Sequence, residues 1–127
     1  MTIPIGPRPP GVPDQQRILG AIQGAARRTG VDAKFLEAIA RVESGLKPDA
    51  RATTSSASGL YQFTSGTWLD LAERHGASAG VDMQQMGRQQ VLNKRGDVEV
   101  ASTMAALHTR ENAEALQRSL GRSPSTN

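Results

Sequence analysis

Apolar side chains recur three or four positions apart through most of this chain, and glycine or a capping residue interrupts the pattern between runs. This spacing places successive side chains on one face of an α-helix. Aromatic residues make up only 3% of the 127 residues, whereas hydrophobic residues together make up 37%. The core must therefore be aliphatic and rich in alanine, which favours closely packed helices over a β-sandwich. The sequence predicts an all-α protein with one compact core.

The first two helices are predicted from their caps and their apolar stripes. Asp14 and Asp32 are expected to cap helices over residues 14–29 and 32–44, and Gly45 is expected to end the second. The expected buried stripes are Ile18, Leu19, Ile22, Ala25 and Ala26 in the first helix, and Phe35, Leu36, Ile39, Ala40 and Val42 in the second.

Three further helices are predicted after a loop at 46–58 and a short ordered turn at 59–63. They cover residues 64–76, about 83–94, and 97–120, where Gly121 is expected to end the last one. The expected core positions are Trp68, Leu69, Leu71 and Ala72 in the first of these helices, and Val98, Ala101, Met104, Ala105, Leu107 and Leu116 in the last.

The ends of the chain differ in composition from its middle. Residues 1–13 contain five of the seven prolines, which fix φ and remove backbone donors, so an extended tail is expected there. Residues 14–122 are expected to form one domain and residues 123–127 a second tail. No run approaches the roughly 18 apolar residues of a membrane span, and the N-terminus lacks the apolar segment of a signal peptide. Action outside the cytoplasm would require another export route or a signal that has been removed.

Charge and cysteine content narrow the function classes. The absence of cysteine excludes disulfides, thiolate metal sites and a Cys nucleophile. His75 and His108 share no metal-ligand spacing, so neither a metal nor another cofactor is expected. The net charge of +3 suits an anionic partner, but no phosphate loop or RNA-binding aromatic pattern favours nucleic acid. The basic cluster of Arg88, Lys94 and Arg95 is either a solvated face or attracts an anionic wall polymer.

Glu43 lies in the stretch ARVESGLKPDA at residues 40–50, in the last turn of the second predicted helix. Unpaired carbonyls and the negative end of the helix dipole disfavour another negative charge there. If it is also desolvated, such a carboxyl has a raised pKa, as a general acid requires. Ser44 could orient it through its hydroxyl. The alternative is a surface charge that pairs with Arg41 or Lys47.

A second stretch, ASGLYQF at residues 57–63, contains side chains that suit a sugar ligand. Gln62 offers a donor and an acceptor, and Tyr61 offers a flat face with a polar tip. Glycosidases that use two carboxyl groups hold them about 5–9.5 Å apart. Asp49 and Asp70 are the candidates for a second carboxyl, although a turn cap and a solvated helix residue are simpler interpretations.

Together, VESGLKPDA and SGLYQF resemble the lytic transglycosylases of the goose-lysozyme-like superfamily. Members of that family carry a Glu-Ser pair at a helix end and a Gly-Leu-x-Gln element after a loop. The segments PDARATTSSAS, TSGTWLDLAERHG and LHTRENAEALQRSLGR also resemble the bacterial transglycosylase branch. The likeness extends over about residues 32–122.

This resemblance implies a lysozyme-like helical fold and a peptidoglycan substrate at the periplasm or cell wall. The implied reaction cleaves the β-1,4 bond between N-acetylmuramic acid and N-acetylglucosamine and closes a 1,6-anhydro ring without water. Glu43 would match the single catalytic carboxyl, first as acid and then as base, and Ser44 the residue that positions it. The residues that would match the substrate-binding element are Gly59, Leu60, Tyr61 and Gln62.

The family normally continues with a further helix whose Tyr- or Asn-containing element closes the cleft, and residues 97–127 contain no equivalent. The sequence therefore predicts a truncated domain, a short form with reduced activity, or a cleft completed by a partner from a secretion, flagellar or phage assembly. The alternatives to the lyase are a muramidase that hydrolyses the same bond, a non-catalytic peptidoglycan-binding or assembly module, and a helical adaptor whose Pro-rich tail binds a partner.

Overall fold

The computed structural model describes residues 12–122, which form five α-helices and one 3-10 turn and contain no strand. The predicted all-α class is confirmed. The elements are α1 (Val12–Thr29), α2 (Ala33–Ser44), α3 (Ser65–Ala79), α4 (Arg88–Asn93), η1 (Lys94–Gly96) and α5 (Val98–Arg122). Of the predicted tails, residues 1–11 and 123–127 lie outside the described residues, whereas Val12 and Pro13 belong to α1.

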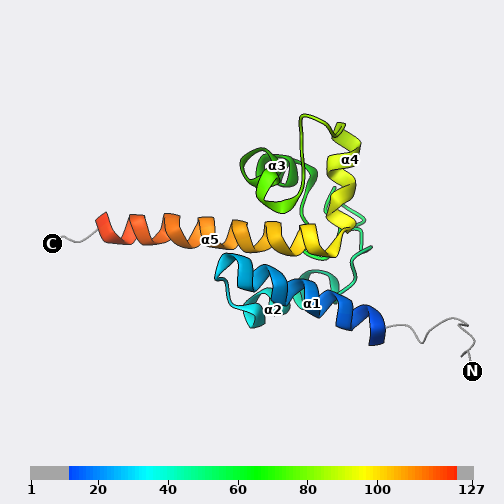
Figure 1. Ribbon diagram of the computed structural model, residues 1–127, viewed down its shortest axis with the longest axis horizontal. Helices are drawn as coiled ribbons and strands as arrows, with labels where there is room; N and C mark the ends of the chain where they lie inside the picture. The colour runs from blue at the N-terminus through cyan, green and yellow to red at the C-terminus, as the bar shows by residue number, and fades with distance from the viewer. Residues whose placement is uncertain (1–11, 123–127) are drawn as a thin grey trace, which may run out of the picture.

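Helix α5 organises the fold, with α1 and α2 on one side of it and α3 and α4 on the other (Figure 1). Most of its first ten residues are buried between the two groups. The contact between α1 and α5 is fixed by two arginines from opposite ends of the chain. Arg28 donates to Thr103 Oγ1 at 2.6 Å, and Arg110 donates to the Thr29 carbonyl at 3.2 Å.

The predicted caps at Asp32 and Asp97 and the predicted stop at Gly45 are confirmed, whereas Asp14 lies inside α1 and Gly121 lies inside α5. Asp32 Oδ1 accepts from Lys34 N at 2.9 Å, and Asp97 Oδ1 accepts from Glu99 N at 3.0 Å. Gly45 ends α2 with φ 65°. These are local signals, so the sequence alone was sufficient to place them.

Several predicted boundaries are wrong because tertiary contacts override the local signal. Helix α3 continues through Gly76, which lies against the Val81 backbone, where a Cβ would come within 2.6 Å of the Val81 carbonyl oxygen. The left-handed Gly80 ends the helix instead. Helix α4 begins at Arg88 and not near 83, because turns around Asp82 hold the preceding residues.

Trp68 is fully buried, as predicted, and its indole N–H donates to the Val91 carbonyl at 2.6 Å. Phe63 packs beside it with ring centroids 5.4 Å apart. The bond to Val91 links α3 to α4, and the ring contact links α3 to the turn that follows residue 58. Tyr61, Phe63 and Trp68 therefore form one aromatic cluster at the junction of the later helices and the loop.

Three predicted core residues are exposed. Phe35 and Val42 on α2 are 48% and 84% exposed, and Leu116 on α5 is 60% exposed. Leu36 and Ala40 form the inner face of α2, and at about 100° per residue Val42 lies on its opposite side. Leu116 is exposed because the C-terminal half of α5 extends beyond the other helices (Figure 1).

Glu111 on α5 pairs with Arg74 on α3, with nitrogen–oxygen distances of 2.9 and 3.0 Å, and lies 3.1 Å from His75 Nε2. The Arg74 hydrogen bonds, followed by the contact with His75, lower the pKa of Glu111 from 4.5 to about 2. A lowered carboxyl pKa stabilises the folded chain above the unfolded value and ceases to do so as pH falls through the folded value.

We therefore expect Glu111→Gln to lower the unfolding temperature slightly at pH 7, with a difference from wild type that shrinks as pH falls from 4.5 towards 2. Thermal unfolding followed by circular dichroism at several pH values measures this. Glu114→Gln on the same helix is the matched control, because Glu114 is exposed and forms no ion pair with the described residues. A difference that stays constant down to pH 2 would contradict the assignment.

Candidate functional site

Glu43 lies in the last turn of α2, and its side chain is exposed. Two successive left-handed residues, Gly45 and Leu46, turn the chain immediately after it, and the Leu46 side chain is buried. Arg41 pairs with Glu37 at 2.8 Å, and Glu43 forms no ion pair with the described residues. The surface pair predicted as the simpler alternative is therefore not formed. The Glu43 carboxyl is also not shielded from water by the described residues.

The Ser44 hydroxyl closes the end of α2 and does not contact Glu43 by a hydrogen bond. It donates to the Ala40 carbonyl at 3.1 Å and accepts from Lys47 N at 3.1 Å. Both partners are backbone groups, so Ser44 fixes the path of the chain as it leaves the helix.

The loop after α2 folds back on itself before the turn at 59–62. Ala52 N donates to the Ala57 carbonyl at 3.0 Å, and Gly59 N donates to the Ala50 carbonyl at 2.8 Å. Isolated bridges join Arg51 to Ser58 and Ser58 to Phe63. The loop predicted at 46–58 is therefore ordered by its own backbone hydrogen bonds.

Gly59 is required at the start of this turn for two independent reasons. Its φ of 90° lies in the left-handed region that L side chains rarely adopt. A Cβ at this position would also collide with the Arg95 carbonyl oxygen. Its role is to let the turn pack closely on η1.

Leu60 and Tyr61 are buried, with exposed fractions of 0% and 5%. The Tyr61 hydroxyl donates to the Leu36 carbonyl at 3.1 Å, and burial raises its pKa to about 12. In this structure Tyr61 has no open face on which a sugar could stack. Instead it ties the turn to α2 at Leu36, seven residues before Glu43. The stretch that contains Glu43 is joined to the turn through its last residue, Ala50, whose carbonyl accepts from Gly59 N.

Gln62 also has a left-handed backbone, with φ 54°, and is partly buried. Its Nε2 donates to the Ala50 carbonyl at 3.0 Å and to the Gly59 carbonyl at 2.8 Å. The donors predicted for a ligand are thus used to brace the turn. Oε1 accepts no hydrogen bond from the described residues and is the part of this side chain available to a ligand.

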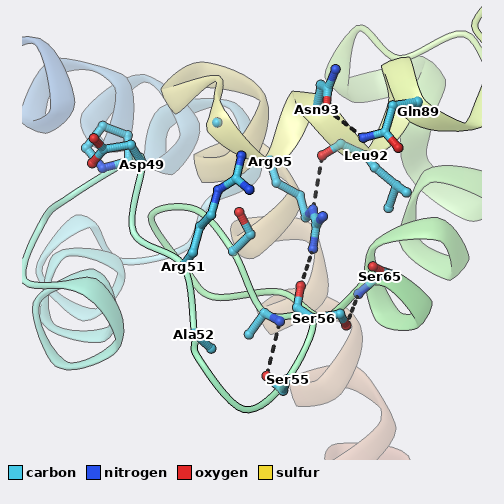
Figure 2. Close-up of a pocket in the computed structure, with 14 residues that line it drawn as sticks. Asp49, Arg51, Ala52, Ser55, Ser56, Ser65, Gln89, Leu92, Asn93 and Arg95 are labelled. Carbon is cyan, nitrogen blue, oxygen red and sulfur yellow. Dashed lines mark hydrogen bonds between the residues drawn. The ribbon is translucent and has the colours of Figure 1, made fainter.

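A cavity of about 710 Å³ lies beside the same loop, and Glu43 is not among its lining residues. Figure 2 shows Arg51, from the loop, and Arg95, from η1, on its wall. The Arg95 guanidinium donates to the carbonyls of Leu92, Ser56 and Phe63 at 3.0, 2.7 and 3.0 Å.

Arg95 is the main residue whose role the sequence did not reveal. It was expected to belong to a basic cluster that is either a solvated face or an attraction for an anionic polymer. One of its carbonyl partners, Leu92, lies three residues before it in the chain. The other two, Phe63 and Ser56, lie 32 and 39 residues before it. No spacing rule connects positions that far apart, so only the structure brings them together.

The remaining candidates lie apart from the turn. Asp49 is exposed and lines the cavity, and Asp70 is exposed on α3. Among residues 12–122 there is no group of three or more His, Cys, Asp or Glu side chains that could hold a metal ion. No helix within this range is both long and apolar enough to cross a membrane.

One comparison with known proteins bears on this site. A family model described as the transglycosylase SLT domain matches residues 20–118. The match begins within α1 and ends near the C-terminus of α5, so it includes Glu43, the turn at 59–62 and the cavity.

Proposed function

Because the chain belongs to the transglycosylase SLT domain family, we propose that it cleaves the β-1,4 bond between N-acetylmuramic acid and N-acetylglucosamine in peptidoglycan and forms 1,6-anhydro-N-acetylmuramic acid. The observation that carries the proposal is that the second motif packs against the helix that carries Glu43. Glu43 stands at the open end of α2, and Tyr61 holds the Gly59–Gln62 turn against that helix through the Leu36 carbonyl.

In the proposed reaction Glu43 acts in both half-steps. Its carboxylic acid donates a proton to the glycosidic oxygen, and the bond from C1 to that oxygen breaks with its electron pair on the leaving sugar. The muramoyl C6 hydroxyl oxygen then forms a bond to C1, and the Glu43 carboxylate takes the hydroxyl proton. Glu43 ends protonated, as it began, and no water is consumed.

Substrate contacts are assigned to the groups that the turn leaves free. Gln62 Oε1 can accept a hydrogen bond from a sugar hydroxyl or an acetamido N–H. Bound substrate also excludes water from the Glu43 carboxyl, which is exposed in the free protein. A carboxyl that a ligand desolvates binds its proton more tightly, which suits the first step.

The exposure of Glu43 also favours a second candidate, a non-catalytic peptidoglycan-binding or assembly module. A carboxyl that stayed hydrated with substrate bound would lack the environment of a general acid. In that case the loop and turn would recognise glycan without turnover. Either function implies action at the cell wall or in the periplasm.

Product analysis distinguishes these candidates. Purified peptidoglycan is incubated with the chain, and the released fragments are examined by mass spectrometry. We expect fragments that end in 1,6-anhydro sugars, each lighter by one water than the hydrolysis product. Fragments with reducing ends only would identify a muramidase. Sedimentation with peptidoglycan in the absence of any released fragment would identify the binding module.

A further inference from the structure

The cavity beside the loop brings two cationic groups to one wall. Arg51 and Arg95 both line it, and Figure 2 shows the Arg51 side chain extending towards η1 and Arg95. Burial, and after it the nearby Arg51 charge, lower the pKa of Arg95. The two guanidinium groups therefore repel each other, and a bound anion would relieve that repulsion.

The two arginines differ in what remains free on them. Arg95 is partly buried and is occupied by three backbone carbonyls. Arg51 is exposed, and its guanidinium forms no hydrogen bond or ion pair with the described residues. Arg51 is thus the group available to a ligand, while Arg95 supplies fixed positive charge behind it.

Three neutral side chains of the lining, Ser55, Ser56 and Asn93, each accept one hydrogen bond and keep a donor free, whereas Gln89 uses its amide as a donor to Asn93. Ser55 Oγ accepts from Ala57 N at 3.1 Å, and Ser56 Oγ accepts from Ser65 N at 3.0 Å. Each hydroxyl therefore keeps its own proton to donate.

The amide of Asn93 follows the same pattern. Asn93 Oδ1 accepts from Gln89 Nε2 at 2.9 Å, which leaves the Asn93 Nδ2 donors free. Asp49 is the single acidic residue of the lining, and Figure 2 places it at the edge, away from Ser55 and Ser56. The lining thus offers hydrogen-bond donors and positive charge.

We propose that this cavity binds the carboxylates of the peptide carried by muramic acid, with Arg51 as the ionic contact and Ser55, Ser56 and Asn93 as donors. The choice of this ligand rests on the proposed function. The volume of the cavity fits a peptide ligand, because ligand sites typically span about 300–1,000 Å³. The cavity also lies close to Glu43 along the chain, because Pro48 on its wall follows Glu43 by five residues, which span at most about 18 Å of backbone.

Nucleic acid fits this lining less well. Bases bind single-stranded sites by stacking on aromatic side chains, and Tyr61, Phe63 and Trp68 are buried. None of these three aromatic residues lines the cavity. A carboxylate, in contrast, needs only charge and convergent donors, which an arginine fork supplies well.

Binding of a free stem peptide tests the proposal without depending on turnover, because the peptide contains no glycosidic bond. The probes are the acidic peptide, the same peptide with its carboxylates converted to amides, and inorganic phosphate. Backbone amide NMR shifts report both the affinity and the place of binding. We expect the acidic peptide to shift the signals of Ser55, Ser56 and Asn93, and amidation to weaken binding by about tenfold.

Arg51→Gln is expected to remove the difference between the acidic and the amidated peptide. Arg27→Gln on α1 is the matched control, because it removes the same charge from an exposed arginine outside the cavity lining. Arg51→Gln keeps its circular dichroism spectrum, because the side chain has no partner to lose.

The proposal is overturned if the amidated peptide binds as well as the acid, if Arg27→Gln weakens binding as much as Arg51→Gln, or if phosphate binds while the peptide does not. These outcomes leave the proposed lyase reaction untouched. Conversely, peptide binding without release of anhydro sugars would overturn the lyase and leave the carboxylate site standing.

Discussion

Replacing Glu43 with Gln is expected to reduce the release of 1,6-anhydro fragments by about 10²–10⁴-fold, the range that a positioned acid or base contributes. An amide has a similar shape but can neither donate the required proton nor take one from the C6 hydroxyl. The loss should appear in kcat, because binding of the glycan does not require the proton. Release of soluble fragments, quantified by liquid chromatography and mass spectrometry, measures it.

The stability of this variant provides a second, independent readout. Glu43 places a negative charge at the C-terminal end of α2, where the helix dipole opposes it. Glu43→Gln should therefore unfold at the same urea concentration as wild type or slightly higher. Glu37→Gln on the same helix is the matched control and should retain activity, since Glu37 pairs with Arg41. Equal loss of activity in both variants would remove Glu43 from the mechanism.

Gly59→Ala is expected to lower the free energy of unfolding by about 3 kcal/mol, as strained backbone and steric collision together commonly do. The methyl group would meet the Arg95 carbonyl oxygen, and the residue would have to keep a φ of 90°. Because the colliding atom belongs to the backbone of η1, a side-chain rotation cannot relieve the contact. Urea unfolding followed by tryptophan fluorescence reports the change, since Trp68 is buried beside Phe63.

Gly66→Ala is a control with the opposite expected sign. Gly66 lies in the first turn of α3 and is exposed, and a Cβ there meets nothing within 4 Å. Alanine is the better helix former by about 1 kcal/mol, so this variant should gain stability. If Gly59→Ala stays within 0.5 kcal/mol of wild type, the turn must be able to move away from η1, and the rigid packing described above is wrong.

The sequence predicted those parts of the fold that depend on neighbouring residues. The cap at Asp32 and the stop at Gly45 are decided within one turn of helix, and both were placed correctly. The stop at Gly76 was placed wrongly because Val81 packs against that glycine. On α2, Leu36 and Ala40 are buried as predicted, but Phe35 and Val42 were wrongly included in the buried face, because the partner helices, and not the run of apolar residues, decide its width.

The candidate site shows the same difference between features set by neighbouring residues and features set by tertiary contacts. Its two motifs were recognised in the sequence, and the family match includes both. The contact between the second motif and α2 could not be foreseen, because Tyr61 reaches back 25 residues to the Leu36 backbone carbonyl. The cavity was missed for a related reason. Its wall combines the loop after α2 with η1. Ser55, Ser56 and Asn93 can be identified as donors only once the hydrogen bonds that they accept are known.

The packing of α1 on α5 has a consequence for the order of folding. Arg28 and Thr103 are 75 residues apart in the chain, so α1, made early in synthesis, lacks its principal neighbour until α5 follows. Closing a loop of that length costs about 4 kcal/mol of chain entropy. The contact between α1 and α5 can therefore form only after α5 has been synthesised. Until then the apolar stripe of α1 is uncovered and is the surface to which a chaperone would bind.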